Sequence, residues 1–206
     1  MAYPVTVSVQ PLITNRNRVS TAFRLLLAIP HIVLVGGIGV AASNRGFGES
    51  FGGHGGILGF VAFVLAIVSW FTIVIGATHV VGIRQFTAFY MRWRVRALAY
   101  LMLLQDAYPP FGDAPYPASL EIVDPAARDR LTVAFRIILG IPHFIILFFL
   151  LFAWWLTAIV AWIAIVIFGD YPEGLYNFGV GCLRWMLRVE SYVLLLVDQY
   201  PPFSLD

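Results

Sequence analysis

Two histidines occupy the positions best suited to chemistry. His31 and His143 each directly follow a proline inside an apolar stretch, within the similar sequences AIPH and GIPH. Two imidazoles facing one another could ligate the metal of a haem or a pigment. Alternatively, each ring lies near the membrane surface and hydrogen-bonds a lipid head group or a carbonyl that the proline leaves without its helical partner. Because no other ligand type accompanies the pair, we favour the structural interpretation and expect no cofactor.

Arginines form the second group of candidate residues. One arginine precedes each histidine by two turns, and two further pairs occur at the i, i+4 spacing of a helix. Guanidinium groups suit bidentate contacts to phosphate, so these residues could bind lipid phosphates, although the anchoring of helices at the membrane surface is the more common role. The candidates are Arg24, Arg92, Arg96, Arg136, Arg184 and Arg188. Asp106 and Asp198 either pair with these arginines or are solvated acids at helix ends.

Patterns typical of enzymes and metal sites are missing from the sequence. It contains no HExxH or GxSxG motif and no paired carboxylates inside an apolar segment. Cys182 is the single cysteine, which excludes an internal disulfide and a cysteine-based zinc site. The net charge of +2 does not suggest a nucleic-acid partner. We therefore expect a protein that is not an enzyme and that binds neither metal nor nucleic acid.

The composition of the chain and its long apolar runs are typical of a membrane protein. Hydrophobic residues make up 60% of the chain and charged residues only 12%, against about 25% charged in an average soluble domain. Residues 137–168 contain no Asp, Glu, Lys or Arg, and apolar runs of about 20 residues are typical of membrane helices. The N-terminus lacks a basic segment before an apolar core, so we expect no cleaved signal peptide. The composition predicts an all-α integral membrane protein.

The chain contains an internal duplication. RVSTAFRLLLAIPH reappears as RLTVAFRIILGIPH after 112 residues, whereas SWFTIVI reappears as AWIAIVI after only 92. DAYPPF near the middle of the chain likewise returns as DQYPPF near its end, again after 92 residues. We predict two tandem repeats, residues 1–111 and 112–206, and the change of shift places a Gly-rich insert near 36–56 of the first.

The insert suggests a topology for each repeat. Loop tips tolerate insertions better than helices do, so we predict a transmembrane helical hairpin in each repeat, with the second tip near Trp154-Trp155. The predicted membrane segments, about four in all, are 24–42, 58–78, 135–152 and 154–169. Because the last two are short, a re-entrant pair or a single span over residues 135–169 is left open.

The arginines also indicate an orientation. With four crossings, every arginine except Arg45 falls on one side of the membrane. The positive-inside rule then predicts a multi-pass protein of the bacterial inner membrane with both termini in the cytoplasm.

Each repeat also has parts outside the membrane. Alternating residues at 3–9 and 116–122 predict two short strands, which could pair into a small sheet. After the hairpin, residues 82–105 and 174–197 repeat aromatic and apolar residues at helical spacing beside an arginine pair, as in an interfacial amphipathic helix. The later part of each segment is apolar all round, so packing on the membrane helices is left open as well. The double proline of each YPPF motif ends that helix and folds its end onto the interface.

The combined pattern resembles a known family. RLxxxFRxxLxIPH, followed by AWxAI, GDYPEGLYNFGVGCLRWMLRVxSY and DQYPPFSL, is similar to the bacterial membrane family called domain of unknown function 4389. The second repeat matches more fully, whereas the first departs at GATHVVGIRQF and in its Gly-rich insert. The resemblance implies a small helical membrane module, often in tandem, and it implies no activity, substrate or cofactor.

We therefore expect an accessory or scaffold subunit of a membrane complex, with lipids and other membrane-protein subunits or further copies as its partners. The alternative is a lipid- or small-molecule-binding membrane protein that uses the interfacial arginine pairs.

Overall fold

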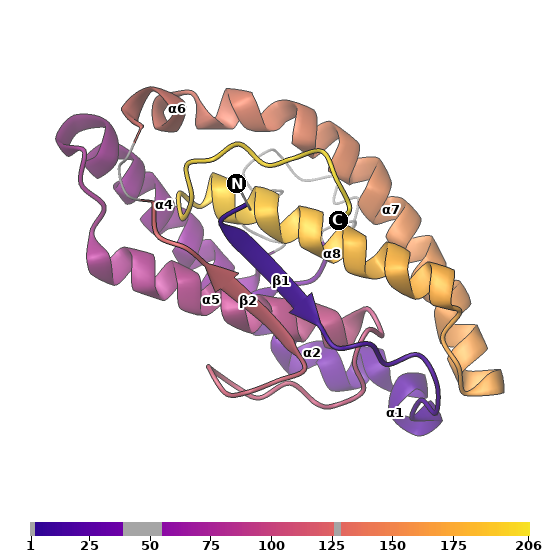
Figure 1. The fold of residues 1–206 in the computed structure, drawn as a ribbon. Helices are drawn as coiled ribbons and strands as arrows, with labels where there is room; N and C mark the ends of the chain where they lie inside the picture. The colour runs from indigo at the N-terminus through magenta and orange to yellow at the C-terminus, as the bar shows by residue number, and fades with distance from the viewer. Residues whose placement is uncertain (1–2, 39–54, 126–128) are drawn as a thin grey trace, which may run out of the picture.

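The computed structural model describes residues 3–38, 55–125 and 129–206, and it is mostly helical (Figure 1). The elements, in chain order, are β1 (Val5–Val9), α1 (Arg18–Ala22), α2 (Arg24–Val35), α4 (Gly56–Gly76), α5 (Val81–Leu101), β2 (Ala118–Ile122), α6 (Arg130–Ala134), α7 (Arg136–Phe168) and α8 (Glu173–Val193). Most of the predicted Gly-rich insert, with Arg45, lies outside the described residues.

The two repeats begin their helices in the same way. The side chain of Asn17 accepts a hydrogen bond from the backbone N–H of Ser20, and that of Asp129 accepts from Leu131 and Thr132. Such N-caps satisfy backbone donors that have no partner inside the helix. A short first helix, α1 or α6, therefore leads into the long apolar helix of each repeat.

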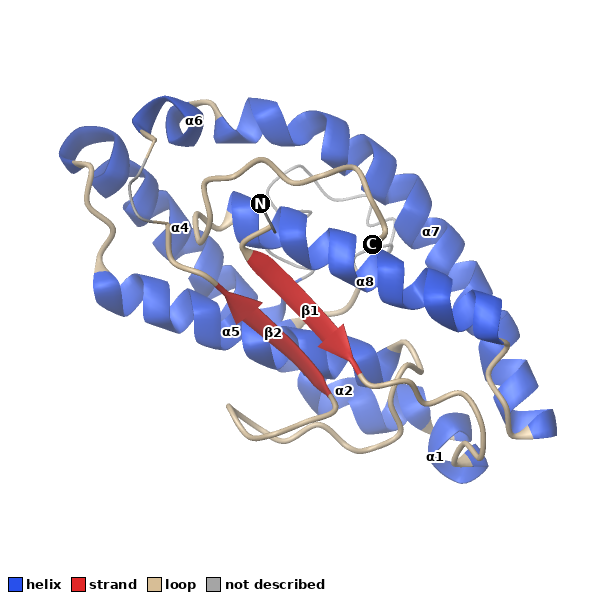
Figure 2. Cartoon of the chain, in the orientation of Figure 1, coloured by secondary structure: helices blue, strands red, loops and turns tan. Residues whose placement is uncertain are grey.

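The two strands pair with one another, as the sequence predicts. β1 and β2 form an antiparallel two-stranded sheet in which Val7 lies opposite Leu120 (Figure 2). These two residues are counterparts in the two repeats, and the register is the same when read from either strand. The pairing is therefore self-complementary, with a pseudo-two-fold axis that passes between Val7 and Leu120 perpendicular to the sheet. Alternate residues of each strand, including this central pair, are buried against α5 and α8.

Further contacts between the repeats follow the same pseudo-two-fold symmetry. The indole N–H of Trp70 in α4 donates to the carbonyl of Val133 at 3.0 Å, and its counterpart Trp162 in α7 donates to the carbonyl of Thr21 at 2.9 Å. Each long apolar helix thus ends against the short first helix of the other repeat. It follows that α7 runs antiparallel to the path of α2 and α4.

The tyrosine that precedes each strand adds a second reciprocal contact. Tyr3 donates to the carbonyl of Gln199, and Tyr116 donates to the carbonyl of Ala107. The first bond runs from repeat one to repeat two, whereas the second joins the start of repeat two to the tail of repeat one. The tyrosine before each strand therefore anchors the C-terminal tail of the other repeat through a hydrogen bond.

The predicted hairpin of the second repeat is wrong. Trp154 and Trp155 lie in the middle of α7, which is one helix of 33 residues, and Trp154 is fully buried. No glycine or proline lies between residues 143 and 168, so nothing in this stretch interrupts the helical hydrogen bonds. A re-entrant pair over residues 135–169 is not formed either, and the single helix α7 is long and apolar enough for the third alternative, a single span.

The insert of the first repeat instead divides a helix. α2 has 12 residues and α4 has 21, which together match the 33 residues of α7. The start of α4 packs closely on the end of α2. A Cβ added to Gly56, whose φ is +65°, would lie 2.6 Å from the backbone nitrogen of Gly36, so only glycine permits this approach. Within the described residues, two helices, α4 and α7, are long and apolar enough to cross a membrane, in place of the four segments expected.

The predicted interfacial helices form the centre of the molecule. α5 and α8 lie beneath the sheet and between the longer apolar helices (Figure 1). Their apolar side chains are covered by protein, with Leu98 in α5 and Leu187 in α8 among those fully buried. The prediction that these faces lie in lipid is therefore wrong, because the sheet and the outer helices cover them.

Candidate functional site

Arg24 is buried at the centre of a polar cluster in the first repeat. Its guanidinium forms an ion pair with Asp106 at 2.7 Å and donates to the carbonyls of Tyr100 and Gln105. It also lies 4.1 Å above the ring of Tyr100, a cation–π contact. Only 1% of the residue is exposed, so Arg24 is enclosed by protein and presents no open face to a lipid phosphate.

Arg136 makes the same contacts in the second repeat. It pairs with Asp198 at 2.8 Å, donates to the carbonyls of Tyr192 and Val197, and lies 4.2 Å above the Tyr192 ring. Only 2% of Arg136 is exposed. The repeated Arg–Tyr–Asp pattern of the sequence thus corresponds to one repeated ion-pair cluster.

The ends of α5 and α8 explain why arginine occupies these places. Leu103 and Leu195, just beyond the helices, have φ values of 65° and 63°, which turn the chain sharply. A helix end leaves carbonyl groups without partners, and it carries partial negative charge that favours a cation. Arg24 and Arg136 satisfy these carbonyls from the neighbouring helix.

Asp106 also pairs with an arginine that sequence reasoning did not single out. Arg16 donates to both carboxylate oxygens of Asp106, at 3.0 and 2.7 Å, and to the carbonyl of Leu103. Burial acts to raise the pKa of Asp106, but the hydrogen bonds from Arg16 and the Asn17 N–H outweigh it and hold that pKa below its usual value. Arg16 lies just before the N-cap, where a sequence pattern gives no indication of its partner.

His31 lies inside an aromatic cluster of its own repeat. The indole N–H of Trp93 donates to Nδ1 of His31 at 3.1 Å, and the ring of Phe111 stacks on the imidazole with centroids 4.6 Å apart. Tyr108 packs on the same ring at 5.0 Å. Tyr108 and Phe111 are the first and last residues of YPPF, so this motif covers the histidine.

His143 is covered in the same manner. Trp185 donates to its Nδ1 at 3.1 Å, Phe203 stacks on it at 4.1 Å and Tyr200 packs at 4.9 Å. An indole can only donate, so Nδ1 accepts and the proton of the neutral imidazole is on Nε2.

Both histidines are thus packed inside aromatic clusters of their own repeats. Among the ring contacts of the described residues, His31 and His143 do not meet, and each is stacked within its own repeat. No group of three or more His, Cys, Asp or Glu side chains that could hold a metal occurs in the described residues. Each histidine therefore lies in the aromatic cluster of its own repeat.

The two arginine pairs at i, i+4 spacing have different surroundings. Arg92 and Arg96 both form ion pairs with Asp113, and their hydrogen bonds outweigh burial to hold its pKa below the usual value. Arg184 instead donates to the carbonyl of Val7 at 3.3 Å, and Arg188 lies 5.9 Å from the ring of Tyr3. The four residues therefore lie beside the strands and the segments that adjoin them.

A second unforeseen cluster joins α5 to α8. Arg94 is buried, pairs with Glu190 at 2.8 Å and also donates to the carbonyls of Val35 and Gly37 at the end of α2. Glu190 accepts a further bond from Tyr90. Arg94 has Met186 as its counterpart, so the departure from the repeat is the sequence signal for this cluster.

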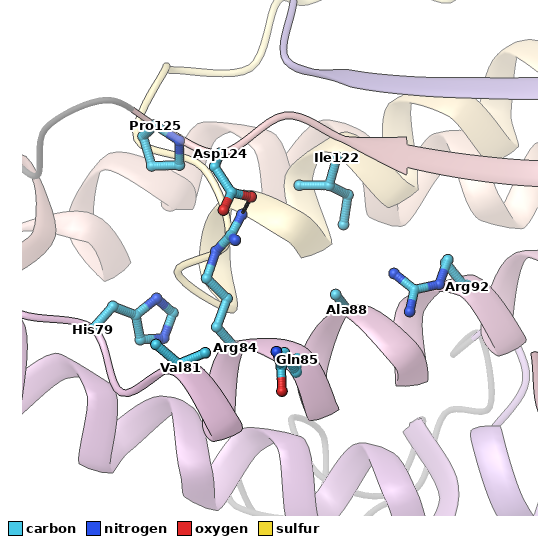
Figure 3. Close-up of a pocket in the computed structure, with 9 residues that line it drawn as sticks. All are labelled: His79, Val81, Arg84, Gln85, Ala88, Arg92, Ile122, Asp124 and Pro125. Carbon is cyan, nitrogen blue, oxygen red and sulfur yellow. Dashed lines mark ion pairs between the residues drawn. The ribbon is translucent and has the colours of Figure 1, made fainter.

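A cavity of about 450 Å³ lies between the first turns of α5 and the end of β2 (Figure 3). Arg84 points across it to an ion pair with Asp124, and Arg92 and His79 lie at its two ends. The remaining lining residues are Val81, Gln85, Ala88, Ile122 and Pro125. The charged groups of the lining are thus two guanidinium groups and one carboxylate, and each arginine is paired with an aspartate.

Comparison with known proteins gives one result. The family model described as Domain of unknown function (DUF4389) matches residues 51–112 and 130–204, one segment in each repeat and together well over half of the chain. Searches of the curated proteins and of the solved structures found no match. The match confirms the resemblance noted in the sequence: the chain belongs to the DUF4389 family, in two segments as expected for tandem copies.

Proposed function

We propose that this chain is a membrane-embedded protein without catalytic activity, acting as an accessory or scaffold subunit of a membrane complex. The observation that carries the proposal is the outward surface of α7. Its buried residues form a single stripe, Arg136, Gly140, His143, Leu147, Trp154, Ala161 and Ile165. Large apolar side chains on its other faces are exposed, Phe149 at 65% and Phe168 at 70%.

The same kind of surface covers the other outer helices. Leu25 and Ile29 of α2 and Ile57 and Phe71 of α4 are at least half exposed. Soluble monomers rarely expose contiguous apolar patches larger than a few hundred Å². This surface therefore favours a covering of lipid or of other membrane subunits.

The polar clusters support a structural role. Two deeply buried charges, Arg24 and Arg136, are engaged by the chain's own aspartates and carbonyls. Their duplicated arrangement holds each YPPF segment over its histidine. For localisation, we propose the bacterial inner membrane with both termini on the cytoplasmic side, because Arg84, Arg92 and Arg184 contact the strands or the segments that adjoin them, on the same side as the start of the chain.

Purification of the full chain in mild detergent tests this proposal. We expect it in the membrane fraction after alkaline washing, and in detergent we expect co-purifying subunits or further copies. Phe149→Arg on the lipid side of α7 should reduce membrane recovery several-fold, whereas Thr6→Arg on the outer face of the sheet should leave it unchanged. Recovery of a lone monomer that stays soluble without detergent would contradict the proposal.

The second candidate function is binding of an anionic lipid head group or small molecule in the cavity beside α5. The arginine lining of that cavity favours it, and the repeat supplies a matched control. Arg92→Ala changes a lining residue, whereas Arg184→Ala changes its counterpart, which does not line the cavity. Native mass spectrometry should show loss of retained anionic lipid for the first variant only. Equal retention in both variants would remove this function.

A further inference from the structure

We propose that the protein lies within one leaflet of the bilayer and does not cross it. In this arrangement the pseudo-two-fold axis runs along the membrane normal, the sheet faces water, and α2, α4 and α7 lie lengthwise among the lipid chains. The inference rests on the membrane embedding proposed above, and it replaces the multi-pass topology expected from the sequence.

The symmetry of the fold limits the possible orientations. The axis is perpendicular to the sheet and exchanges α7 with the path of α2 and α4, which runs in the opposite direction. If α7 crossed the bilayer, its partner path would cross in the reverse direction. An axis that exchanges two opposed crossings lies in the membrane midplane. The sheet, through which the axis passes, would then lie at mid-depth.

Mid-depth is unfavourable for this sheet. Its outer face carries exposed polar side chains, Thr6 opposite Glu121 and Ser8 opposite Ser119. A two-stranded sheet also has two open edges, and open sheet edges do not occur where lipid tails surround them. A carboxylate such as that of Glu121 is costly at the centre of a bilayer. A crossing orientation therefore places the polar outer face of the sheet among lipid tails instead of in water.

The in-plane orientation places the same groups in water. Three arginines outside the buried clusters reach the strand side of the molecule: Arg84 pairs with Asp124 just beyond β2, Arg92 pairs with Asp113 just before it, and Arg184 donates to the carbonyl of Val7 in β1. Most of the exposed large apolar residues lie on α2, α4 and α7. Charged and apolar surfaces are thus separated along the axis, as an interfacial protein requires.

The length of α7 agrees with this orientation. A helix of 33 residues is about 50 Å long, whereas the hydrocarbon core is about 30 Å thick. A helix that lies in the membrane plane has no such limit. The division of the first repeat's helix at the insert is tolerated for the same reason, since neither part is required to span the bilayer.

Accessibility of engineered thiols tests the orientation. Ser20→Cys and Thr132→Cys are counterparts in the two repeats, placed where α1 and α6 begin the long helices. A membrane-impermeant maleimide is applied to right-side-out and inside-out vesicles that contain the full chain. The wild type is the control, because Cys182 is buried and its pKa is raised to about 12 by burial.

We expect both thiols to react at least tenfold faster from the same side. Ser8→Cys and Glu121→Cys on the outer face of the sheet should react from that side too. Reaction of Ser20→Cys and Thr132→Cys from opposite sides would overturn the proposal, as would protection of both sheet thiols from either side. Failure of the membrane embedding itself is distinguishable, because the chain would then be absent from the vesicles.

Discussion

Replacing Arg94 by methionine, the residue at the equivalent place of the second repeat, should strongly destabilise the fold. The insert after α2 exposes the carbonyls of a helix end that α7 does not have, and Arg94 donates to two of them, those of Val35 and Gly37. It also pairs with Glu190, which links α5 to α8. Arg94→Met removes all of these bonds at once.

The magnitude follows from the burial of each partner. Removing one partner of a buried ion pair costs about 3–5 kcal/mol, and we take the lower end, about 3 kcal/mol, because the Glu190 side chain is 21% exposed. The two carbonyls left without a donor add about 1 kcal/mol in total, since the helix end can relax toward other donors. We therefore expect a loss of about 4 kcal/mol in the free energy of unfolding, a large part of the stability of a typical domain.

A double-mutant cycle measures the effect in detergent micelles by denaturant unfolding. Leu98 is the counterpart of Glu190, so Arg94→Met with Glu190→Leu makes the first and second repeats alike at both places. The double variant should be about 2 kcal/mol more stable than Arg94→Met alone, because no unpaired carboxylate is left. Arg92→Met, which removes a partly exposed arginine two residues away in the same helix, should cost about 1 kcal/mol or less. A loss below about 1 kcal/mol for Arg94→Met, or strict additivity in the cycle, would refute this account.

Three further outcomes are expected. Asp106→Asn leaves two buried arginines without their carboxylate and should lower the unfolding free energy by about 3 kcal/mol; a loss below about 1 kcal/mol in denaturant unfolding would contradict the assignment. The pKa of Asp106 and that of Asp113 are below their usual value in the folded state. Their contribution to the free energy of unfolding is therefore complete above the unfolded pKa of about 4, and it is lost as the pH falls through the folded pKa. The thermal midpoint should be constant above about pH 5 and should fall below about pH 4, less steeply in Asp106→Asn. Trp70→Phe and Trp162→Phe should each cost about 1 kcal/mol because they remove equivalent hydrogen bonds, and a cost confined to one of them would disprove the reciprocity.

The repeats and their strands could be predicted because they depend on local pattern. Alternation predicts β1 and β2, and the shared sequence locates the arginine, histidine and YPPF of each repeat. The pairing of Arg24 with Asp106 was among the alternatives that the sequence offered.

The path of the long helices could not be predicted in the same way. An insertion is typical of a loop tip and therefore favours a hairpin, but in the structure the insertion lies between α2 and α4, whose counterpart in α7 has no turn. A helix interruption of this kind is stabilised by tertiary contacts, here Arg94 and the close approach of Gly56, and these are not visible in periodicity.

The covering of α5 and α8 depends on tertiary structure in a similar manner. Their aromatic and apolar faces have the pattern of a helix at a lipid surface, and the same pattern suits a helix covered by protein. The environment in the structure is protein, because β1 and β2 lie over both helices. The contacts of His31 with YPPF likewise join residues about eighty positions apart, beyond the reach of any local motif.

The self-complementary register of β1 and β2 bears on how such a chain could arise. A polypeptide with a single copy would present one strand with an unpaired edge, together with a tyrosine and a tryptophan whose acceptors belong to another copy. Two such polypeptides would satisfy each other through the same bonds that join the halves here. The duplicated protein can thus be understood as a homodimer whose subunits became covalently linked, after which one half was free to gain an insertion and the Arg94–Glu190 bond that accommodates it.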